Sequence, residues 1–117
     1  MNTEFVFVGE GSRREEVLQW MKEQDLNLDQ LDTIVLLDRA AQFSGTVPVA
    51  RLLLADAEQS LAGLKIEPLL SLPPDASEKE VFEIFDKYNL RMLTIVDENN
   101  RPIGAITVDD VVSRLVK

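Results

Sequence analysis

The sequence predicts an α/β fold in which one β-α-β-β-α unit is used twice. The 117 residues are enough for one domain or for two small repeats that share a core. An apolar content of 45% is typical of a packed globular chain. The same order of helix, strand, glycine and helix patterns occurs in both halves, which indicates an internal repeat. We expect the first repeat to span residues 1–62 and the second to span residues 63–117.

Each repeat is expected to open with a short strand and a helix. The strands are "EFVFV" at residues 4–8 and "EPLLSL" at residues 67–72, the second of which ends at Pro73-Pro74. Ser12 then precedes Glu15 by three residues, and Ser77 precedes Glu80 in the same way. This spacing predicts a capping box, in which hydroxyl and carboxylate satisfy free amides at a helix start. Apolar residues follow at helical spacing in both copies: Val17, Leu18 and Met21, then Val81, Ile84 and Phe85.

Two further strands and a second helix should complete each repeat. "TIVLLD" ends at Asp38 and "MLTIVD" ends at Asp97, and each aspartate lies seven positions before a glycine, Gly45 or Gly104. Each glycine leads through "TVPV" or "AITV" into an apolar helix. The glycines are 59 positions apart (104 − 45) and the serines are 65 apart (77 − 12), so we expect a six-residue insertion in the first copy, near "EQDLNLDQLD". We expect the two repeats to pack as a pseudo-symmetric pair, because each alone buries too little apolar surface.

Composition excludes several classes of function. The net charge of −9, from 12 basic and 21 acidic residues, should repel phosphate backbones and argues against nucleic-acid binding. Without Cys or His the chain can hold no disulfide, no soft-ligand zinc site and no Ser-His-Asp triad, so a bound metal would be a hard cation with oxygen ligands. No apolar run approaches the roughly 18 residues of a membrane span, and the N-terminus has no signal-peptide pattern. We therefore expect no direct membrane insertion of this chain and a cytosolic location.

The repeat resembles a CBS domain pair, or Bateman module, and the second copy carries the more specific match in "DENNRPIGAITVDDV". The stretch "VARLLLADAEQSLAGL", followed by "EPLLSLPPDASEKEVFEIFDKYNL", is similar to the CBS pair of MgtE-type magnesium transporters. The resemblance implies a regulatory module rather than an enzyme, which biases the state of a neighbouring protein when adenosine nucleotides or cations bind. It also implies a homodimer formed through the CBS helices.

Thr107 and Asp110 are the candidate nucleotide-binding residues. In "GAITVDD" the threonine ends a strand and the aspartate lies in the first helical turn, where a hydroxyl and a carboxylate can bind ribose hydroxyls beside helix N-terminal amides. The resemblance implies that these residues contact ATP, ADP or AMP. The simpler alternative is that Thr107 is an N-cap and that the aspartates only complement the helix dipole.

The first repeat departs from this pattern. At the offset of 59 the equivalents of Thr107 and Asp110 are Pro48 and Arg51. Proline has no hydroxyl, and arginine cannot accept a hydrogen bond from a ribose hydroxyl. At most one of the two pockets should therefore keep the nucleotide signature.

Mg²⁺ is the other candidate ligand, and Asp110 is its candidate ligand residue. Mg²⁺ binds through one or two carboxylates and keeps several waters. The resemblance implies that such carboxylates lie at domain interfaces, where the cation screens their repulsion. Asn89 and Ser113 stand where the resemblance leads us to expect ligands, which argues against a strong site. The Asp97-Glu98 pair is more typical of a solvated turn than of a ligand pair.

The sequence therefore predicts the cytosolic regulatory module of a divalent-cation transporter of the MgtE type. Its expected partners are a second copy of the chain and the transmembrane domain of the same parent protein. The alternative is a CBS pair that serves an enzyme or that senses adenylates by itself. No nucleophile, base or cofactor motif supports catalysis.

Overall fold

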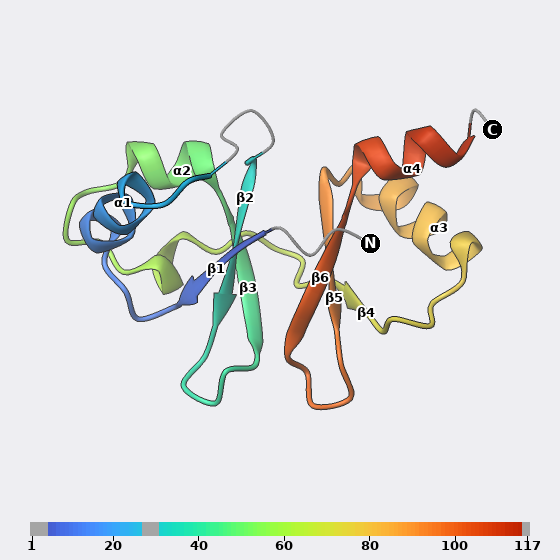
Figure 1. Cartoon of the computed structure of the whole chain (residues 1–117), viewed down its shortest axis with the longest axis horizontal. Coiled ribbons are helices and arrows are strands. Elements are labelled where there is room, and N and C mark those ends of the chain that lie inside the picture. The colour runs from blue at the N-terminus through green and yellow to red at the C-terminus, as the bar shows by residue number, and fades with distance from the viewer. Residues whose placement is uncertain (1–4, 27–30, 116–117) are drawn as a thin grey trace. The chain divides into compact units, whose positions relative to one another are not determined.

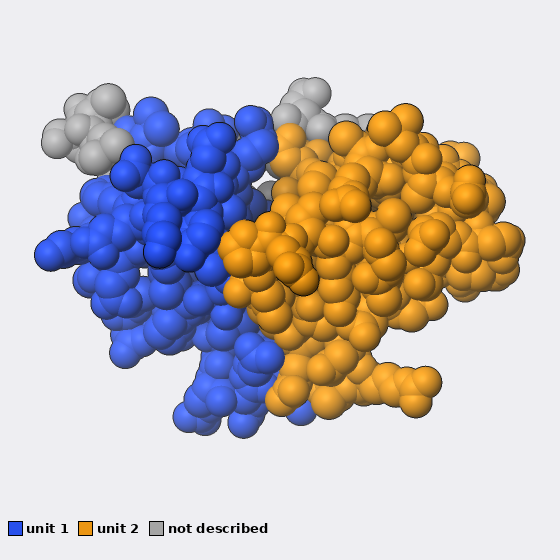
Figure 2. Space-filling view, turned by 180° about the vertical axis from the view of Figure 1, so that it is seen from behind, with its two compact units in different colours: residues 1–5, 70–117 blue, residues 6–69 orange. Residues whose placement is uncertain are grey.

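The chain forms two compact units, each built on a three-stranded sheet (Figure 1). This computed structural model describes residues 5–26 and 31–115. The first-repeat unit comprises residues 6–69 and is orange in Figure 2. The second-repeat unit comprises residues 1–5 and 70–117 and is blue.

The first-repeat unit follows the predicted element order. Strand β1 (Val6–Gly9) pairs in parallel with β2 (Thr33–Leu37), which pairs antiparallel with β3 (Phe43–Pro48). The helices α1 (Arg14–Lys22) and α2 (Val49–Leu54) lie on one face of this sheet (Figure 1). A short 3-10 helix, η1 (Leu61–Leu64), follows in the segment that leads to the second repeat.

The second-repeat unit has the same topology. Strand β4 (Ser71–Leu72) pairs in parallel with β5 (Met92–Val96), and β5 pairs antiparallel with β6 (Pro102–Thr107). Helices α3 (Glu78–Tyr88) and α4 (Val108–Leu115) lie on one face of the sheet (Figure 1). The prediction of a β-α-β-β-α unit used twice is confirmed.

The predicted strand at residues 67–72 is shorter than expected. Only Ser71 and Leu72 pair with β5, whereas Pro68 follows a cis peptide bond and lies outside the strand. Proline has no backbone N–H to donate to a ladder, so pairing cannot extend through it.

Two aspartates hold the hairpin turns at equivalent positions. Asp97 Oδ1 accepts the amide N–H groups of Asn99 and Arg101, both at 2.9 Å. Asp38 Oδ1 accepts those of Ala40 and Gln42 at 2.8 and 3.0 Å. Asn100 and its counterpart Ala41 have φ of 61° and 62°. The interpretation of Asp97-Glu98 as a turn is thus confirmed, and the glycine seven positions after each aspartate lies in the strand that follows the turn, β3 or β6.

The two first helices start differently. Glu80 N–H donates to Ser77 Oγ at 3.1 Å, so the predicted N-cap role of Ser77 in α3 is confirmed, while the Glu80 carboxylate accepts from the Ser77 hydroxyl at 3.3 Å. The predicted box of Ser12 with Glu15 is wrong by one residue, because the N-cap of α1 is Arg13, whose N–H donates to the Glu16 carboxylate at 3.0 Å. Backbone carbonyls satisfy the first amides of α1, so a serine hydroxyl is not needed there.

The N-caps give the correct offset between the repeats. Arg13 and Ser77 are 64 positions apart (77 − 13), and the β1–β2 and β4–β5 registers agree with this value. The strands and helices that follow are 59 apart, so the insertion has five residues (64 − 59) rather than the predicted six. It falls between α1 and β2, and its residues 27–30 lie outside the described part of the chain.

Each unit has its own buried cluster between helices and sheet. In the first-repeat unit the cluster comprises Val6, Val17, Ile34, Leu36, Val47, Leu52 and Leu61. In the second-repeat unit it comprises Val81, Phe85, Leu93 and Val111. The cluster of the first-repeat unit includes one residue, Leu61, that no pattern in the repeat predicts.

Candidate functional site

A pocket of about 260 Å³ opens in the second-repeat unit. It lies where the N-terminal ends of α3 and α4 meet β5 and β6, so two helix starts share one rim. Its lining residues are Pro73, Pro74, Ala76, Glu78, Val81, Phe82, Ile95, Ile106, Asp110 and Val111.

The pocket has an apolar floor and a polar edge. Val81 and Phe82 come from α3, Ile95 and Ile106 come from the sheet, and Val111 comes from α4. A flat apolar group of the size of a purine ring fits such a floor chemically, because ligand pockets combine apolar walls with a few placed polar groups. The edge carries the carboxylates of Glu78 and Asp110, which can accept hydrogen bonds from hydroxyl groups.

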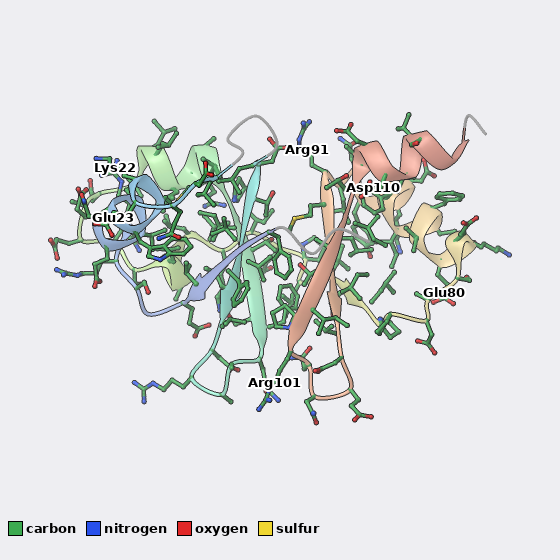
Figure 3. All side chains as sticks on the ribbon, in the orientation of Figure 1. Lys22, Glu23, Glu80, Arg91, Arg101 and Asp110 are labelled. Carbon is green, nitrogen blue, oxygen red and sulfur yellow. The ribbon has the colours of Figure 1, made fainter. Side chains whose placement is uncertain are left out.

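Thr107 and Asp110 form a reciprocal capping pair at the start of α4. Thr107 N–H donates to Asp110 Oδ2 at 3.1 Å, and Asp110 N–H donates to Thr107 Oγ1 at 3.3 Å. This geometry confirms the N-cap role predicted for Thr107 and adds a reciprocal bond to Asp110, which was expected only to complement the helix dipole. The pair also fixes the Asp110 side chain, which Figure 3 shows at the start of α4, where it lines the pocket.

Most of the residues considered as ligands of a cation have a structural role instead. Asn89 is the C-cap of α3 in the left-handed conformation, with φ of 52°, and Ser113 is exposed on α4. Asp97 is used by its hairpin turn. Among residues 5–26 and 31–115 there is no group of three carboxylates that could hold a metal ion. Weak binding at Asp110 remains a prediction.

Pro48 and Arg51 are the first-repeat equivalents of Thr107 and Asp110, and both lie at the start of α2 as the offset of 59 predicts. Pro48 ends β3 and is the N-cap of α2, with no side-chain cap, and Arg51 is exposed in the same short helix. No hydroxyl or carboxylate therefore replaces the capping pair of Thr107 and Asp110.

The sequence pattern missed most of the pocket wall. Pro73 and Pro74 predict only the end of a strand, and Phe82 lies outside the residues predicted for the site. A signal for Phe82 exists, because it matches Leu18 at the offset of 64 and so continues the apolar helical spacing. The prolines carry no signal for a pocket, because their role depends on the tertiary fold.

Comparison with known proteins supports the family resemblance. Residues 62–117 match the model of the CBS domain. The chain is 29% identical over 115 residues to the magnesium transporter MgtE of Thermus thermophilus, covering 98% of this chain and 26% of that protein. It is 21% identical over 89 residues to MgtE of Bacillus subtilis, covering 76% of this chain and 20% of that protein. The chain thus spans about a quarter or less of the length of these relatives.

Solved structures agree with this result. The cytosolic domain of the Mg²⁺ channel MgtE in complex with ATP superposes with a TM-score of 0.84 at 27% identity, covering 96% of this chain and 45% of that one. CBSX2 in complex with AMP has a TM-score of 0.76 at 16% identity, covering 99% and 92%, and shares the fold. The predicted resemblance to a CBS domain pair of MgtE type is confirmed. Within the described residues, no helix has the length and apolar character that crossing a membrane requires.

Proposed function

On the premise that the chain is a pair of CBS-type repeats, we propose that it is the cytosolic regulatory module of a divalent-cation transporter, in the manner of MgtE. We further propose that it responds to an adenosine nucleotide and to Mg²⁺. Similarity to the MgtE relatives supports the transporter context, and the ATP complex of the MgtE cytosolic domain supports the nucleotide.

One observation carries the nucleotide proposal. Asp110, named from the sequence as a ribose ligand, lines a pocket with an apolar floor at two helix starts. Its Oδ2 is engaged by Thr107 N–H, so a ribose hydroxyl would donate to Oδ1. The base would lie on the floor formed by residues such as Phe82 and Ile106, and phosphate groups would extend toward the helix N-termini.

Charge should limit how many phosphates are tolerated. Glu78 lines the pocket, and Asp109 and Asp110 lie in the first turn of α4. These carboxylates repel phosphate and oppose the favourable dipoles of the two helices. We therefore expect AMP to bind at least as tightly as ATP when no divalent cation is present.

Calorimetric titration of the 117-residue chain with AMP, ADP and ATP tests the proposal. We expect about one site per chain with a Kd in the micromolar to millimolar range. Asp110→Ala should abolish binding, whereas Arg51→Ala, its matched control in the first repeat, should change Kd less than about twofold. If none of the three nucleotides binds, the capping role alone remains for Thr107 and Asp110.

The proposed partners are a second copy of the chain and a transmembrane domain in the parent protein. Exposed apolar side chains on the helices support self-association, among them Leu53 and Leu54 on α2 and Val112 on α4. Leu54 is 88% exposed. Light scattering should give the mass of a dimer, and a monomer mass at all concentrations would contradict this part of the proposal.

A further inference from the structure

Thr107 and Asp110 differ in their relation to the pocket. Asp110 lines the pocket, whereas Thr107, at the end of β6, is not among the lining residues. Two hydrogen bonds nevertheless join them, from Thr107 N–H to Asp110 Oδ2 at 3.1 Å and from Asp110 N–H to Thr107 Oγ1 at 3.3 Å. A nucleotide in the pocket would therefore meet the Asp110 carboxylate, and Thr107 would act on the nucleotide through that carboxylate.

The first repeat shows that the turn from strand to helix forms without such a pair. There Pro48 ends β3 and is the N-cap of α2 with no side-chain hydrogen bond. One backbone bond recurs at this turn in both repeats. Val49 N–H donates to the carbonyl of Asp32 at 2.9 Å. At the offset of 59, Val108 N–H donates to the carbonyl of Arg91 at 2.8 Å. The two additional hydrogen bonds of the second repeat are thus not needed to build the turn.

These additional bonds fix one side chain at the edge of the pocket. An unrestrained carboxylate rotates about χ1, and a ligand that has to immobilise it loses affinity. With Oδ2 held by the N–H of Thr107, the carboxylate of Asp110 presents Oδ1 to a ligand. An ionised carboxylate only accepts hydrogen bonds, so the group that it recognises is a donor such as a ribose hydroxyl.

The start of α4 suits a ribose better than a phosphate for a second reason. Asp110 N–H is used by the hydroxyl of Thr107, and Val108 N–H is used by the carbonyl of Arg91. Asp109 and Asp110 also place two acidic side chains in the first turn of this helix. A phosphate needs amide donors and is repelled by carboxylates, so this end of the pocket favours a hydroxyl group.

We propose that Thr107 is a positioning residue of the nucleotide site, which fixes the Asp110 carboxylate by two hydrogen bonds and does not itself contact the nucleotide. This role rests on the proposed function, since it takes the ligand of the pocket to be an adenosine nucleotide. Thr107 thus acts indirectly, in place of the direct contact that the resemblance implies.

Three substitutions of Thr107 separate the two hydrogen bonds. Thr107→Ser keeps both, Thr107→Val keeps the main-chain N–H and loses the hydroxyl, and Thr107→Pro loses both. Proline is compatible with this turn, because Pro48 occupies the equivalent position with φ of −62°. The probes are AMP and its 2′,3′-dideoxy analogue, which lacks both ribose hydroxyls.

Calorimetric titration of the wild type should show a preference of about tenfold for AMP over the dideoxy analogue, because a hydroxyl donates to a charged carboxylate only in AMP. We expect Thr107→Ser to keep this preference, Thr107→Val to reduce it, and Thr107→Pro to reduce it to less than about twofold. The affinity for the dideoxy analogue should stay the same in all three.

Ser77→Ala is the matched control, because Ser77 caps α3 at the other helix start of the same pocket. Its loss should change the affinities for AMP and for the dideoxy analogue by the same factor. Parallel losses of both affinities in the Thr107 variants would overturn the proposal, because Thr107 would then have only a structural role. An unchanged preference for AMP in Thr107→Val and Thr107→Pro would also overturn it.

NMR of the chain without nucleotide tests the positioning itself. Three-bond couplings of Asp110 should report one χ1 rotamer in the wild type and in Thr107→Ser, and several rotamers in Thr107→Val and Thr107→Pro. Several rotamers in the wild type would overturn the proposal. So would a Thr107→Val variant that loses the preference for AMP but keeps one rotamer, because the hydroxyl would then contact the nucleotide directly.

These outcomes do not depend on a single variant or on binding. If Thr107→Pro does not fold, the couplings and the AMP preference of Thr107→Val decide between positioning and direct contact. If the wild type binds no AMP, the proposed function is rejected, whereas the couplings still decide whether Thr107 fixes the carboxylate of Asp110.

Discussion

Asp110 combines a local structural role with a position in the candidate site. Its carboxylate accepts the N–H of Thr107, and the same side chain lines the pocket of the second-repeat unit. The sequence predicts the N-cap at Thr107 and the place of Asp110 in the first turn of α4, because both depend on residues three positions apart. The pocket was not predictable, because its floor combines side chains from two helices and two strands.

Thr94 offers a test of the core at the residue scale. It is 1% exposed in the centre of β5, and its hydroxyl has no hydrogen-bond partner among the described residues. The equivalent residue of the first repeat, 59 positions earlier, is the fully buried Val35. A buried hydroxyl without a partner costs about 1 kcal/mol or more, and valine has nearly the same shape.

We therefore expect Thr94→Val to raise the free energy of unfolding by about 1 kcal/mol. This corresponds to an increase in Tm of about 4 °C for a chain of this size. The mirror substitution, Val35→Thr, should lower Tm by a similar amount. Thermal melts followed by circular dichroism measure both, and a Thr94→Val variant less stable than the wild type would contradict this account of the core.

At the scale of elements, the repeated sequence pattern predicts those turns and helix caps that depend only on neighbouring residues. The hairpin turns of Asp38 and Asp97 and the cap of α3 all depend on neighbouring residues and recur at fixed spacing. The start of α1 departs from the predicted one because the backbone carbonyls of Ala57 and Gln59, more than 40 positions away, satisfy its first amides. The burial of Leu61 in the first-repeat cluster is not predictable for the same reason, since a non-local contact leaves no periodic pattern in one short segment.

The contact between Glu10 and Lys65 should make the stability of the first-repeat unit depend on pH. The pKa of the Glu10 carboxyl is lowered from its ordinary value of 4.5 by the nearby Ser44 hydroxyl and by the Lys65 ammonium, which bonds it at 2.9 Å. Ser44 lies near the carboxylate without the geometry of a full hydrogen bond. A carboxyl whose folded pKa is depressed stabilises the fold above its unfolded pKa, and this contribution disappears as pH falls through the folded value.

We expect the stability difference between the wild type and Glu10→Gln to be constant from pH 7 to about 5 and to shrink below about 4.5. Urea unfolding at a series of pH values measures this difference. Glu83→Gln is a suitable control, because Lys79 Nζ lies 4.0 Å from Glu83 on the exposed face of α3. A difference that stays constant down to pH 3 would show that the Glu10–Lys65 contact contributes no pH-dependent stability.

At the scale of the whole molecule, charge is the dominant feature that sequence alone reveals. The net charge of −9 means that a dimer would carry −18 (two times −9), and this repulsion opposes close approach of two copies. Mg²⁺ should relieve it by weak binding among carboxylates, mostly through its waters. Binding to the folded state at ten times Kd stabilises by roughly 1.4 kcal/mol.

A few millimolar MgCl₂ should therefore raise Tm by several degrees, and by more than NaCl at matched ionic strength. Monovalent salt provides the control, because it also screens exposed charges. Asp110→Asn keeps an acceptor for the cap of α4 and should reduce the difference between the two salts. Equal shifts in the two salts would indicate general screening, and the proposed Mg²⁺ response would then be rejected for this chain.

The central claim is that the second repeat binds an adenosine nucleotide and that the first does not. Two-dimensional amide NMR of the chain during titration with AMP tests it most directly, because each pocket residue has an equivalent in the same molecule. We expect the amides of Val81, Ile106, Asp110 and Val111 to shift with a common Kd, while those of Val17, Val47, Arg51 and Leu52 stay in place. Shifts of equal size in both sets, or shifts confined to the first-repeat set, would contradict the claim.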